Sequence, residues 1–268
     1  MTALVDDNAV VSPQAQIDDD VEIGPFCVVG PQVIIGRGTR LENGVTIMGR
    51  VVIGQGNHIY PGAVIGAEPQ DVSYLGSETQ VVIGNHNVIR EGVTINRATE
   101  KEDGITYVGS HNFMMANSHV AHDCHVGNRV TIANNTMLAG HVHVHDYATL
   151  SGGVGVHHYS TVGAYSFVGG ISRVIHDVPP YMLAEGNPAR PRCVNVVALK
   201  RNDFSSSVIK CLTEAHRLIY REKLGLDRAR EEIRNAGQLI PQVNELFGFI
   251  ETQQEGRHGR SRHTRLAA

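Results

Sequence analysis

Residues 11–65, divided every six positions, read VSPQAQ, IDDDVE, IGPFCV, VGPQVI, IGRGTR, LENGVT, IMGRVV, IGQGNH, IYPGAV and I. The first position of every hexad is aliphatic, and Gly often follows it. A helix needs apolar residues at spacings of three and four, and a lone strand needs a spacing of two. The period of six instead predicts a solenoid of short strands and turns. Three hexads would form one triangular coil of eighteen residues, with neighbouring coils about 4.8 Å apart.

The same period continues through most of the chain, with two interruptions. It returns from Ile83 to Ile95, slips by one residue, and runs on from Val108 to Val174. Polar residues replace the expected aliphatic ones within 66–82, and 96–107 forms a second break. We predict a loop excursion at each place. Loops that a rigid scaffold holds often carry function.

Composition restricts the class of protein. The chain has 268 residues, 41% of them hydrophobic and 19% charged, with a formal charge of −4. These values favour a folded protein without a general attraction for nucleic acid. The four cysteines form no CxxC pair, so we expect them to be reduced and structural. We find no signal peptide and no apolar run of bilayer length, and we therefore expect a cytoplasmic protein without stable membrane insertion.

The repeat ends at a rigid connector, Asp177–Tyr181, and helical spacing begins near Asn195. We predict three helices: one capped by Ser205 or Ser206, one over Leu226–Ala236 and one over Val243–Ile250. The predicted division is a β-helix over 1–190, a helical domain over 191–253 and an Arg-containing disordered tail over 254–268.

Histidines gather in one part of the repeat. Of fifteen in the chain, several lie within 117–125, 139–141 and 156–158. Positions eighteen apart stack on adjacent coils, which places Gly140 above His122, and His141 above Asp123. We therefore predict one patch across three coils: His122, Asp123, Gly140, His141, His157 and His158.

Several interpretations of this patch compete. Polar residues could merely cover a solenoid face, and the solenoid could be a scaffold without catalytic activity. Neutral imidazoles also suit zinc, as in β-helix carbonic anhydrases. General-base catalysis needs a histidine with an orienting carboxylate, which His122 and Asp123 supply. A backbone N–H near Gly140 could then stabilise the oxyanion formed when a thioester is attacked.

Several segments together resemble the UDP-N-acetylglucosamine acyltransferases of lipid A synthesis: His119-Val-Ala-His122-Asp123-Cys124, Ala139-Gly140-His141-Val142, Pro69-Gln70-Asp71, Asp177–Tyr181, Gly186-Asn187-Pro188, Val194-Asn195, Leu199-Lys200-Arg201 and Leu218-Ile219-Tyr220-Arg221. The resemblance covers nearly the whole chain. It implies a left-handed parallel β-helix with a C-terminal helical domain. The handedness comes from the resemblance, since physical rules favour right-handed crossovers.

The resemblance also implies the activity and its partners. An (R)-3-hydroxyacyl group would move from acyl carrier protein to the 3-hydroxyl of UDP-N-acetylglucosamine, in a homotrimer with active sites between subunits. No cofactor and no metal are expected. The implied roles are His122 as general base, Asp123 as its orienting partner and Gly140 as oxyanion donor; His119, Gln70, Asp71, His141, His157, His158, Asn195 and Arg201 as substrate contacts; and Phe167 and Gly170 in the acyl-chain region.

The sequence departs from the family pattern at four positions. Ser73 stands where Lys is usual, Val197 where Glu is usual, His158 where Gln is usual, and Asn202 where a second Arg is frequent. These positions concern nucleotide and donor contacts, whereas the catalytic segment is intact. N-acylation of a 3-amino UDP-sugar therefore remains an alternative, and acyl-chain length is left open.

Overall fold

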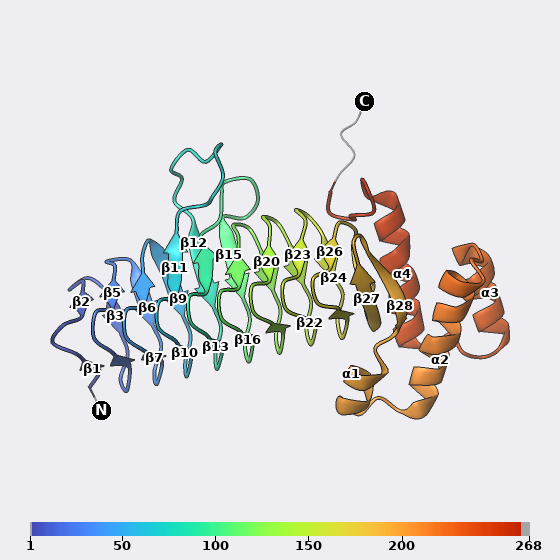
Figure 1. Ribbon diagram of the computed structural model, residues 1–268, viewed down its shortest axis with the longest axis horizontal. Coiled ribbons are helices and arrows are strands. Elements are labelled where there is room, and N and C mark those ends of the chain that lie inside the picture. Colours follow the sequence, from blue (N-terminus) through green and yellow to red (C-terminus); the bar gives the residue numbers. More distant parts are fainter. Residues whose placement is uncertain (1, 264–268) are drawn as a thin grey trace.

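The computed structural model describes residues 2–263, which form an elongated solenoid with a group of helices at its C-terminal end (Figure 1). Successive strands belong to three different sheets, so every third strand pairs with its neighbour in the next coil, in parallel. This is the triangular coil that the period of six predicts.

Short strands make up the three sheets. The first sheet contains β1 (Leu4–Val5), β4 (Glu22–Ile23), β7 (Arg40–Leu41), β10 (His58–Ile59), β13 (Val88–Ile89), β16 (Phe113–Met114), β19 (Thr131–Ile132), β22 (Thr149–Leu150), β25 (Phe167–Val168), β27 (Met182–Gly186) and β28 (Ala189–Val194). The second contains β2 (Val10–Val11), β5 (Val28–Val29), β8 (Thr46–Ile47), β11 (Val64–Ala67), β14 (Thr94–Asn96), β17 (His119–Val120), β20 (Met137–Leu138), β23 (Gly155–Val156) and β26 (Arg173–Val174). The third contains β3 (Gln16–Ile17), β6 (Val33–Ile35), β9 (Arg50–Ile53), β12 (Gln80–Ile83), β15 (Ile105–Val108), β18 (His125–Val126), β21 (His143–Val144) and β24 (Thr161–Val162).

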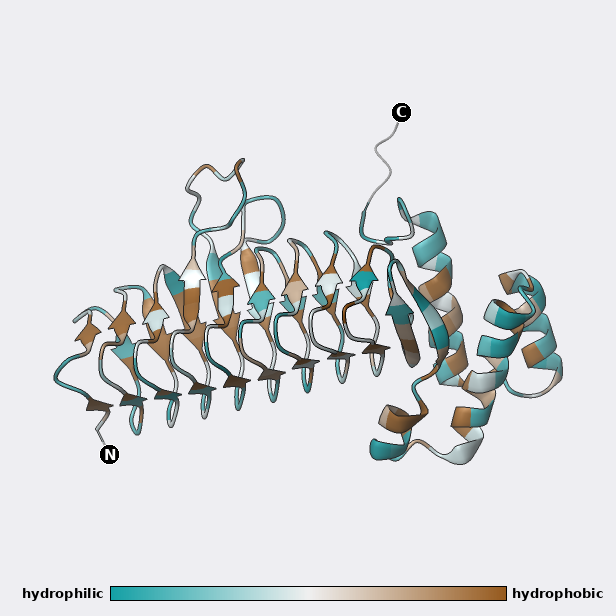
Figure 2. Cartoon of the chain, viewed as in Figure 1, coloured by the Kyte–Doolittle hydropathy of each residue, from teal (hydrophilic) through white to brown (hydrophobic). Residues whose placement is uncertain are grey.

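Most two-residue strands point one side chain outward and one inward. In β19, Thr131 is half-buried, whereas Ile132 is fully buried and lies in register with Met114 and Leu150. Burying such a side chain contributes about 1.5–3 kcal/mol. The aliphatic position of each hexad thus forms a continuous stack along the solenoid, and this stack explains the strict period. Figure 2 shows that the strands carry most of the hydrophobic residues of the solenoid.

One row of corners carries residues of the candidate functional site. Between the second and third sheets, Asp123, His141 and Tyr159 occupy equivalent positions in three successive coils. All three have left-handed backbone conformations, with φ of 58°, 64° and 62°. Asp and His tolerate this region better than most residues, but a row of non-glycine residues remains unusual. The corner therefore places functional side chains where Gly would be the easiest choice for the backbone.

Two loops interrupt the coils, as predicted, but they are shorter than predicted. The first lies between β11 and β12, and the second between β14 and β15. The ends of 66–82 and 96–107 belong to strands, because Ala67 pairs with Asn96 and Gln80 pairs with Ile105. The loops project from the same side of the solenoid (Figure 1).

The C-terminal part differs from the predicted division in one boundary. A hairpin of β27 and β28 extends the first sheet, since Leu183 pairs with Phe167 of β25. The predicted boundary at residues 190/191 falls inside β28, because the amphipathic hairpin lacks the hexad period. The helices beyond it are α1 (Val196–Arg201), α2 (Ser206–His216), the π-helix η1 (Arg217–Arg221), α3 (Leu226–Asn235) and α4 (Pro241–Glu255). Of the two caps considered, Ser205 is the N-cap of α2.

The sequence predicts a disordered tail over 254–268, and this prediction is wrong for residues 254–263. Helix α4 continues to Glu255, and the following residues fold back on the last coil. Arg260 Nη1 donates to the carbonyl of Ile175 at 2.8 Å, and the Ser261 N–H donates to Asp177 Oδ2 at 2.7 Å. The remainder of the predicted tail, 264–268, lies outside the described residues. Among the helices within 2–263, none has the length and apolar character that crossing a membrane requires.

Candidate active site

His122 and Asp123 form a buried pair at the corner between β17 and β18. His122 Nδ1 lies 2.7 Å from Asp123 Oδ2. The His122 side chain is 7% exposed and the Asp123 carboxylate is inaccessible to solvent. An ionised carboxylate can only accept, so it holds the proton on Nδ1 of a neutral His122. Nε2, the other ring nitrogen, is then free to accept a proton from a substrate.

Thr99 of the second loop donates hydrogen bonds to the buried Asp123 carboxylate. Thr99 Oγ1 donates to Asp123 Oδ2 at 2.7 Å, and the Thr99 N–H lies 3.1 and 3.2 Å from the two carboxylate oxygens. Burial alone would raise the pKa of Asp123, but the hydrogen bonds from His122 and Thr99 outweigh burial and lower it. Asp123 is therefore an ionised, fixed acceptor for the His122 ring.

Gly140 lies in the next coil, directly against the His122 ring. A Cβ atom on Gly140 would be 2.4 Å from His122 Cε1 and 2.6 Å from Nε2. The His141 N–H donates to the His122 carbonyl at 3.0 Å, which links the two coils at this point. The absence of a side chain at position 140 thus makes room for the imidazole, as the eighteen-residue stacking predicts.

His141 lies on the other side of Asp123. Its Nε2 is 3.7 Å from Asp123 Oδ2, and its Nδ1 is 3.0 Å from Glu102 Oε1 in the second loop. Its ring stacks on Tyr159 with a centroid distance of 4.4 Å. Burial lowers the pKa of His141, and the negative charges of Asp123 and Glu102 oppose this effect without cancelling it. His141 is thus a supporting residue within the protein rather than part of the open surface.

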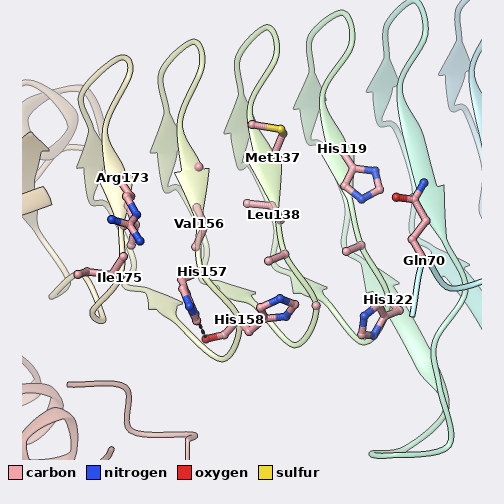
Figure 3. A pocket seen from close by; sticks show the side chains of 15 residues that line it. Gln70, His119, His122, Met137, Leu138, Val156, His157, His158, Arg173 and Ile175 are labelled. Atoms are coloured by element: carbon pink, nitrogen blue, oxygen red, sulfur yellow. Dashed lines mark hydrogen bonds between the residues drawn. The ribbon is translucent and has the colours of Figure 1, made fainter. Parts of the chain in front are cut away.

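A groove of about 360 Å³ runs from this pair along the outer face of the second sheet (Figure 3). Its floor follows one ladder of paired outward residues: His119, Met137, Gly155 and Arg173. Gln70 and His119 lie with His122 at one end, and Arg173 and Ile175 lie at the other (Figure 3). The middle is largely apolar. The groove can therefore accommodate a polar group beside His122 and an alkyl chain beyond it.

His119 forms part of the polar end. Its Nδ1 is 2.7 Å from Thr94 Oγ1, which holds the ring at the groove. Burial and the neighbouring His122 lower the pKa of His119. A neutral His119 can accept or donate one hydrogen bond, as a residue that contacts a sugar would.

The structure brings most of the predicted site residues together. The predicted residues that line the groove are Gln70, His119, His122, Gly140, His157 and His158, and Asp123 and His141 lie directly behind them. Burial lowers the pKa of His158. The prediction of a compact patch around His122, Gly140 and His141 is thus confirmed by the geometry.

Five predicted residues lie elsewhere in the chain. Asp71 Oδ2 accepts from Lys101 Nζ at 2.6 Å, which joins the two loops. The Asn195 side chain caps α1 at Ala198 N and donates to the Tyr165 carbonyl, and Arg201 ends that helix. Phe167 is on the first sheet, and Gly170 is at the corner that follows it. None of the five lines the groove among residues 2–263.

Sequence reasoning missed other residues that shape the site. Met137, Gly155 and Arg173 follow His119 at intervals of eighteen, so the same stacking rule could have found them. Thr99 and Glu102 carry no such signal, because an irregular loop brings them to the corner.

The ligand atoms of His122, Asp123 and His141 lie within 4.8 Å of one another, close enough to hold a metal ion. Their hydrogen bonds fit a different arrangement. Asp123 already accepts from Thr99 and His122, and Nδ1 of His141 faces Glu102. A metal would have to displace several of these bonds. The donor set therefore fits a hydrogen-bonded relay better than a metal centre, and the expectation of a metal-free site stays a prediction.

Comparisons with known proteins agree with the fold and the site. Residues 177–259 match the family model of domain 2 of UDP-N-acetylglucosamine O-acyltransferase, and 105–140 match the bacterial transferase hexapeptide repeat. Residues 5–99 match the family model of the GMPPB C-terminal domain. The chain is 48% identical over 248 residues to an acyl-[acyl-carrier-protein]–UDP-N-acetylglucosamine O-acyltransferase from Thermodesulfovibrio yellowstonii. The aligned region covers 92% of this chain and 96% of the relative.

Solved structures of UDP-N-acetylglucosamine acyltransferases are similar to this chain along most of its length. The UDP-N-acetylglucosamine acyltransferase of Bacteroides fragilis is 36% identical, with a TM-score of 0.89 over 92% of this chain and 97% of that one. The enzyme of Francisella novicida is 39% identical, with a TM-score of 0.88 over 93% and 91%. The predicted left-handed β-helix with C-terminal helices is therefore confirmed. With this fold, this site and these relatives, the chain belongs to the UDP-N-acetylglucosamine O-acyltransferase family.

Proposed function

We propose that this chain transfers an (R)-3-hydroxyacyl group from acyl carrier protein to the 3-hydroxyl of UDP-N-acetylglucosamine, the first step of lipid A synthesis. The observation that carries this proposal is the buried His122–Asp123 pair at the polar end of the groove. Family membership supports both substrates, because the relatives are named for them.

The proposed mechanism uses His122 as general base. Nε2 takes the proton from the sugar hydroxyl, whose oxygen attacks the thioester carbonyl. Asp123 holds the ring and stabilises the imidazolium that forms. The backbone N–H of Gly140 stabilises the tetrahedral oxyanion. The intermediate then expels the carrier's thiolate, which takes the proton back from His122.

The groove offers a place for the acyl chain beyond the reacting atoms. Met137, Leu138 and Val156 provide apolar contacts along the second sheet. Arg173 and Ile175 lie at the far end and would meet the end of a long chain. Phe167 and Gly170 lie away from this path within one subunit. Their proposed influence on chain length would therefore come from a neighbouring subunit.

The proposed homotrimer also accounts for the other displaced residues. Asn195 and Arg201 belong to α1, at the end of the solenoid, and Asp71 belongs to the first loop. In an assembly with active sites between subunits, these residues would meet substrate bound to another copy. We further propose that the enzyme works in the cytoplasm, where acyl carrier protein supplies its donor.

The direct test is a mass-spectrometric product assay with purified enzyme and a panel of 3-hydroxyacyl carrier proteins. We expect a 3-O-acylated product from UDP-N-acetylglucosamine. A parallel reaction with the 3-amino analogue tests the alternative acceptor, which the departures at Ser73 and Val197 leave open. Exclusive acylation of the amino sugar would change the acceptor but keep the mechanism. Product that forms only with added zinc, or no carrier-dependent product, would contradict the proposal.

A further inference from the structure

The C-terminal segment reaches the active-site corner from the far end of the chain. Asp177 anchors this segment: Oδ2 accepts from the Ser261 N–H at 2.7 Å, and Oδ1 accepts from the Thr161 N–H at 2.7 Å. His263 then stacks on Tyr159, with ring centroids 5.3 Å apart. Because Tyr159 itself stacks on His141, residues 261–263 lie against the group that supports the catalytic pair.

Arg262 connects this segment to the second loop. Its Nη2 donates to both oxygens of Glu102, at 2.9 and 3.0 Å, and its Nη1 donates to the carbonyl of His141. Glu102 in turn accepts from His141 Nδ1 at 3.0 Å. The Glu102 side chain is 28% exposed and that of Arg262 is 23% exposed, so the ion pair is partly protected from solvent. Two segments that are 160 residues apart thus hold one imidazole.

We propose that Glu102 and Arg262 form a positioning clamp for the active site, in which Glu102 sets the tautomer of His141 and Arg262 holds Glu102 in place and offsets its charge. This inference rests on the proposed function. An ionised Glu102 keeps the proton of neutral His141 on Nδ1. Its Nε2 then carries no hydrogen and lies 3.7 Å from Asp123 Oδ2, beyond hydrogen-bond distance. His141 and His122 have ring centroids 5.2 Å apart. A charge on His141 would therefore disfavour the imidazolium that His122 must form.

The charges around His141 define how the clamp acts. Glu102 and Asp123 favour its protonated form, whereas His122 opposes protonation. Arg262 cancels much of the Glu102 charge by direct pairing. The neighbouring carboxylate, Asp103, lies instead 3.6 Å from His125 Nε2 on the third sheet. Lys101, on the other side of Glu102 in the sequence, is paired with Asp71.

The clamp predicts that two substitutions shift the pKa of His141 in opposite directions. Removing the charge of Glu102 in Glu102→Gln takes away an anion and lowers the pKa of His141. Removing the charge of Arg262 in Arg262→Gln leaves the Glu102 charge uncompensated and raises the pKa of His141. Single charges at this distance, near a protein surface, should shift the pKa by roughly one to three units. The double variant should return close to the wild-type value. A side chain that acts only through packing would not give such a pattern.

The experiment combines titration with kinetics. The His141 resonance of protein labelled at the histidine Cε1 is followed by NMR against pH, and it is assigned with a His141→Gln variant. In the product assay, we expect each single variant to lose ~10-fold in kcat/KM, because a slightly misplaced base reacts slowly. The pH at which activity falls off on the acid side should move in the same direction as the His141 pKa. Melting curves check that each variant is folded.

Matched controls lie beside the clamp. Glu100→Gln is in the same loop, where Glu100 accepts from Ser77 Oγ, and Arg257→Gln is in the same C-terminal segment. Both should leave the His141 titration and kcat/KM unchanged. Shifts of the same sign in Glu102→Gln and Arg262→Gln, or wild-type titration and kinetics in both, would overturn the proposal. If wild-type protein makes no acylated sugar, the proposed function fails, while the titration still tests the clamp.

Discussion

Gly140→Ala adds a single methyl group at the point where the structure has no room for it. The new Cβ would lie 2.4 Å from His122 Cε1, 2.6 Å from Nε2 and 3.0 Å from Nδ1. Carbon atoms in favourable contact are about 3.5–4.0 Å apart, so the imidazole must retreat by about 1 Å or more. Such a movement loosens the 2.7 Å hydrogen bond to Asp123 and takes Nε2 away from the sugar hydroxyl.

The expected result is a loss of roughly 10²-fold in kcat/KM, which corresponds to about 2.7 kcal/mol of transition-state stabilisation. The backbone N–H at position 140 is retained, so the substitution tests the position of His122 rather than the oxyanion donor. The assay is the rate of product formation from 3-hydroxyacyl carrier protein and UDP-N-acetylglucosamine, and melting curves confirm folding.

Gly155→Ala is the matched control. It makes the same chemical change in the same groove, but a Cβ on Gly155 would meet no atom within 4 Å. This variant should keep kcat within a few-fold of wild type. A Gly140→Ala enzyme with wild-type kcat/KM would refute the reasoning, because His122 would then tolerate displacement or lie elsewhere.

Three further predictions concern the carboxylate, the core and acid stability. Thr99→Val removes the 2.7 Å hydrogen bond to Asp123 and should destabilise the fold by about 1.5–3 kcal/mol in urea unfolding, whereas an unchanged midpoint would contradict the assigned hydrogen bond. Ile132→Ala removes a fully buried side chain and should cost about 2–5 kcal/mol by the same method, with a loss under 1 kcal/mol counting against the stacked core. Burial lowers the pKa of His143 to about 3, so the unfolded chain binds a proton first as the pH falls below about 6.5. Stability should therefore decrease from pH 6.5 towards pH 3, and His143→Gln should flatten this decrease; an equally steep decrease would refute the assignment.

The solenoid could be predicted because one physical requirement repeats in every hexad. Each coil must bury an aliphatic residue at the same place, as Ile132 does between Met114 and Leu150. The same regularity made the stacking of Gly140 over His122 predictable. Handedness did not follow from periodicity and needed the family resemblance.

Contacts outside the repeat could not be predicted in the same way. Thr99 contacts Asp123 and Glu102 contacts His141, and both come from a loop whose partners lie 24 and 39 positions away in the sequence. The Arg-containing tail has the composition of a disordered segment, yet Asp177 and Glu102 order its first part. The family resemblance predicts Asn195 only as a substrate contact, and it does not predict its use as the N-cap of α1.

The central claim is that His122 is the base that activates the sugar hydroxyl. The most direct measurement is the initial rate of acyl transfer by His122→Ala, compared with wild type at the same pH and with verified folding. We predict a loss of ~10²–10⁴-fold in rate with little change in melting temperature, as expected when a general base is removed. A folded His122→Ala protein that transfers the acyl group as fast as wild type would contradict the account.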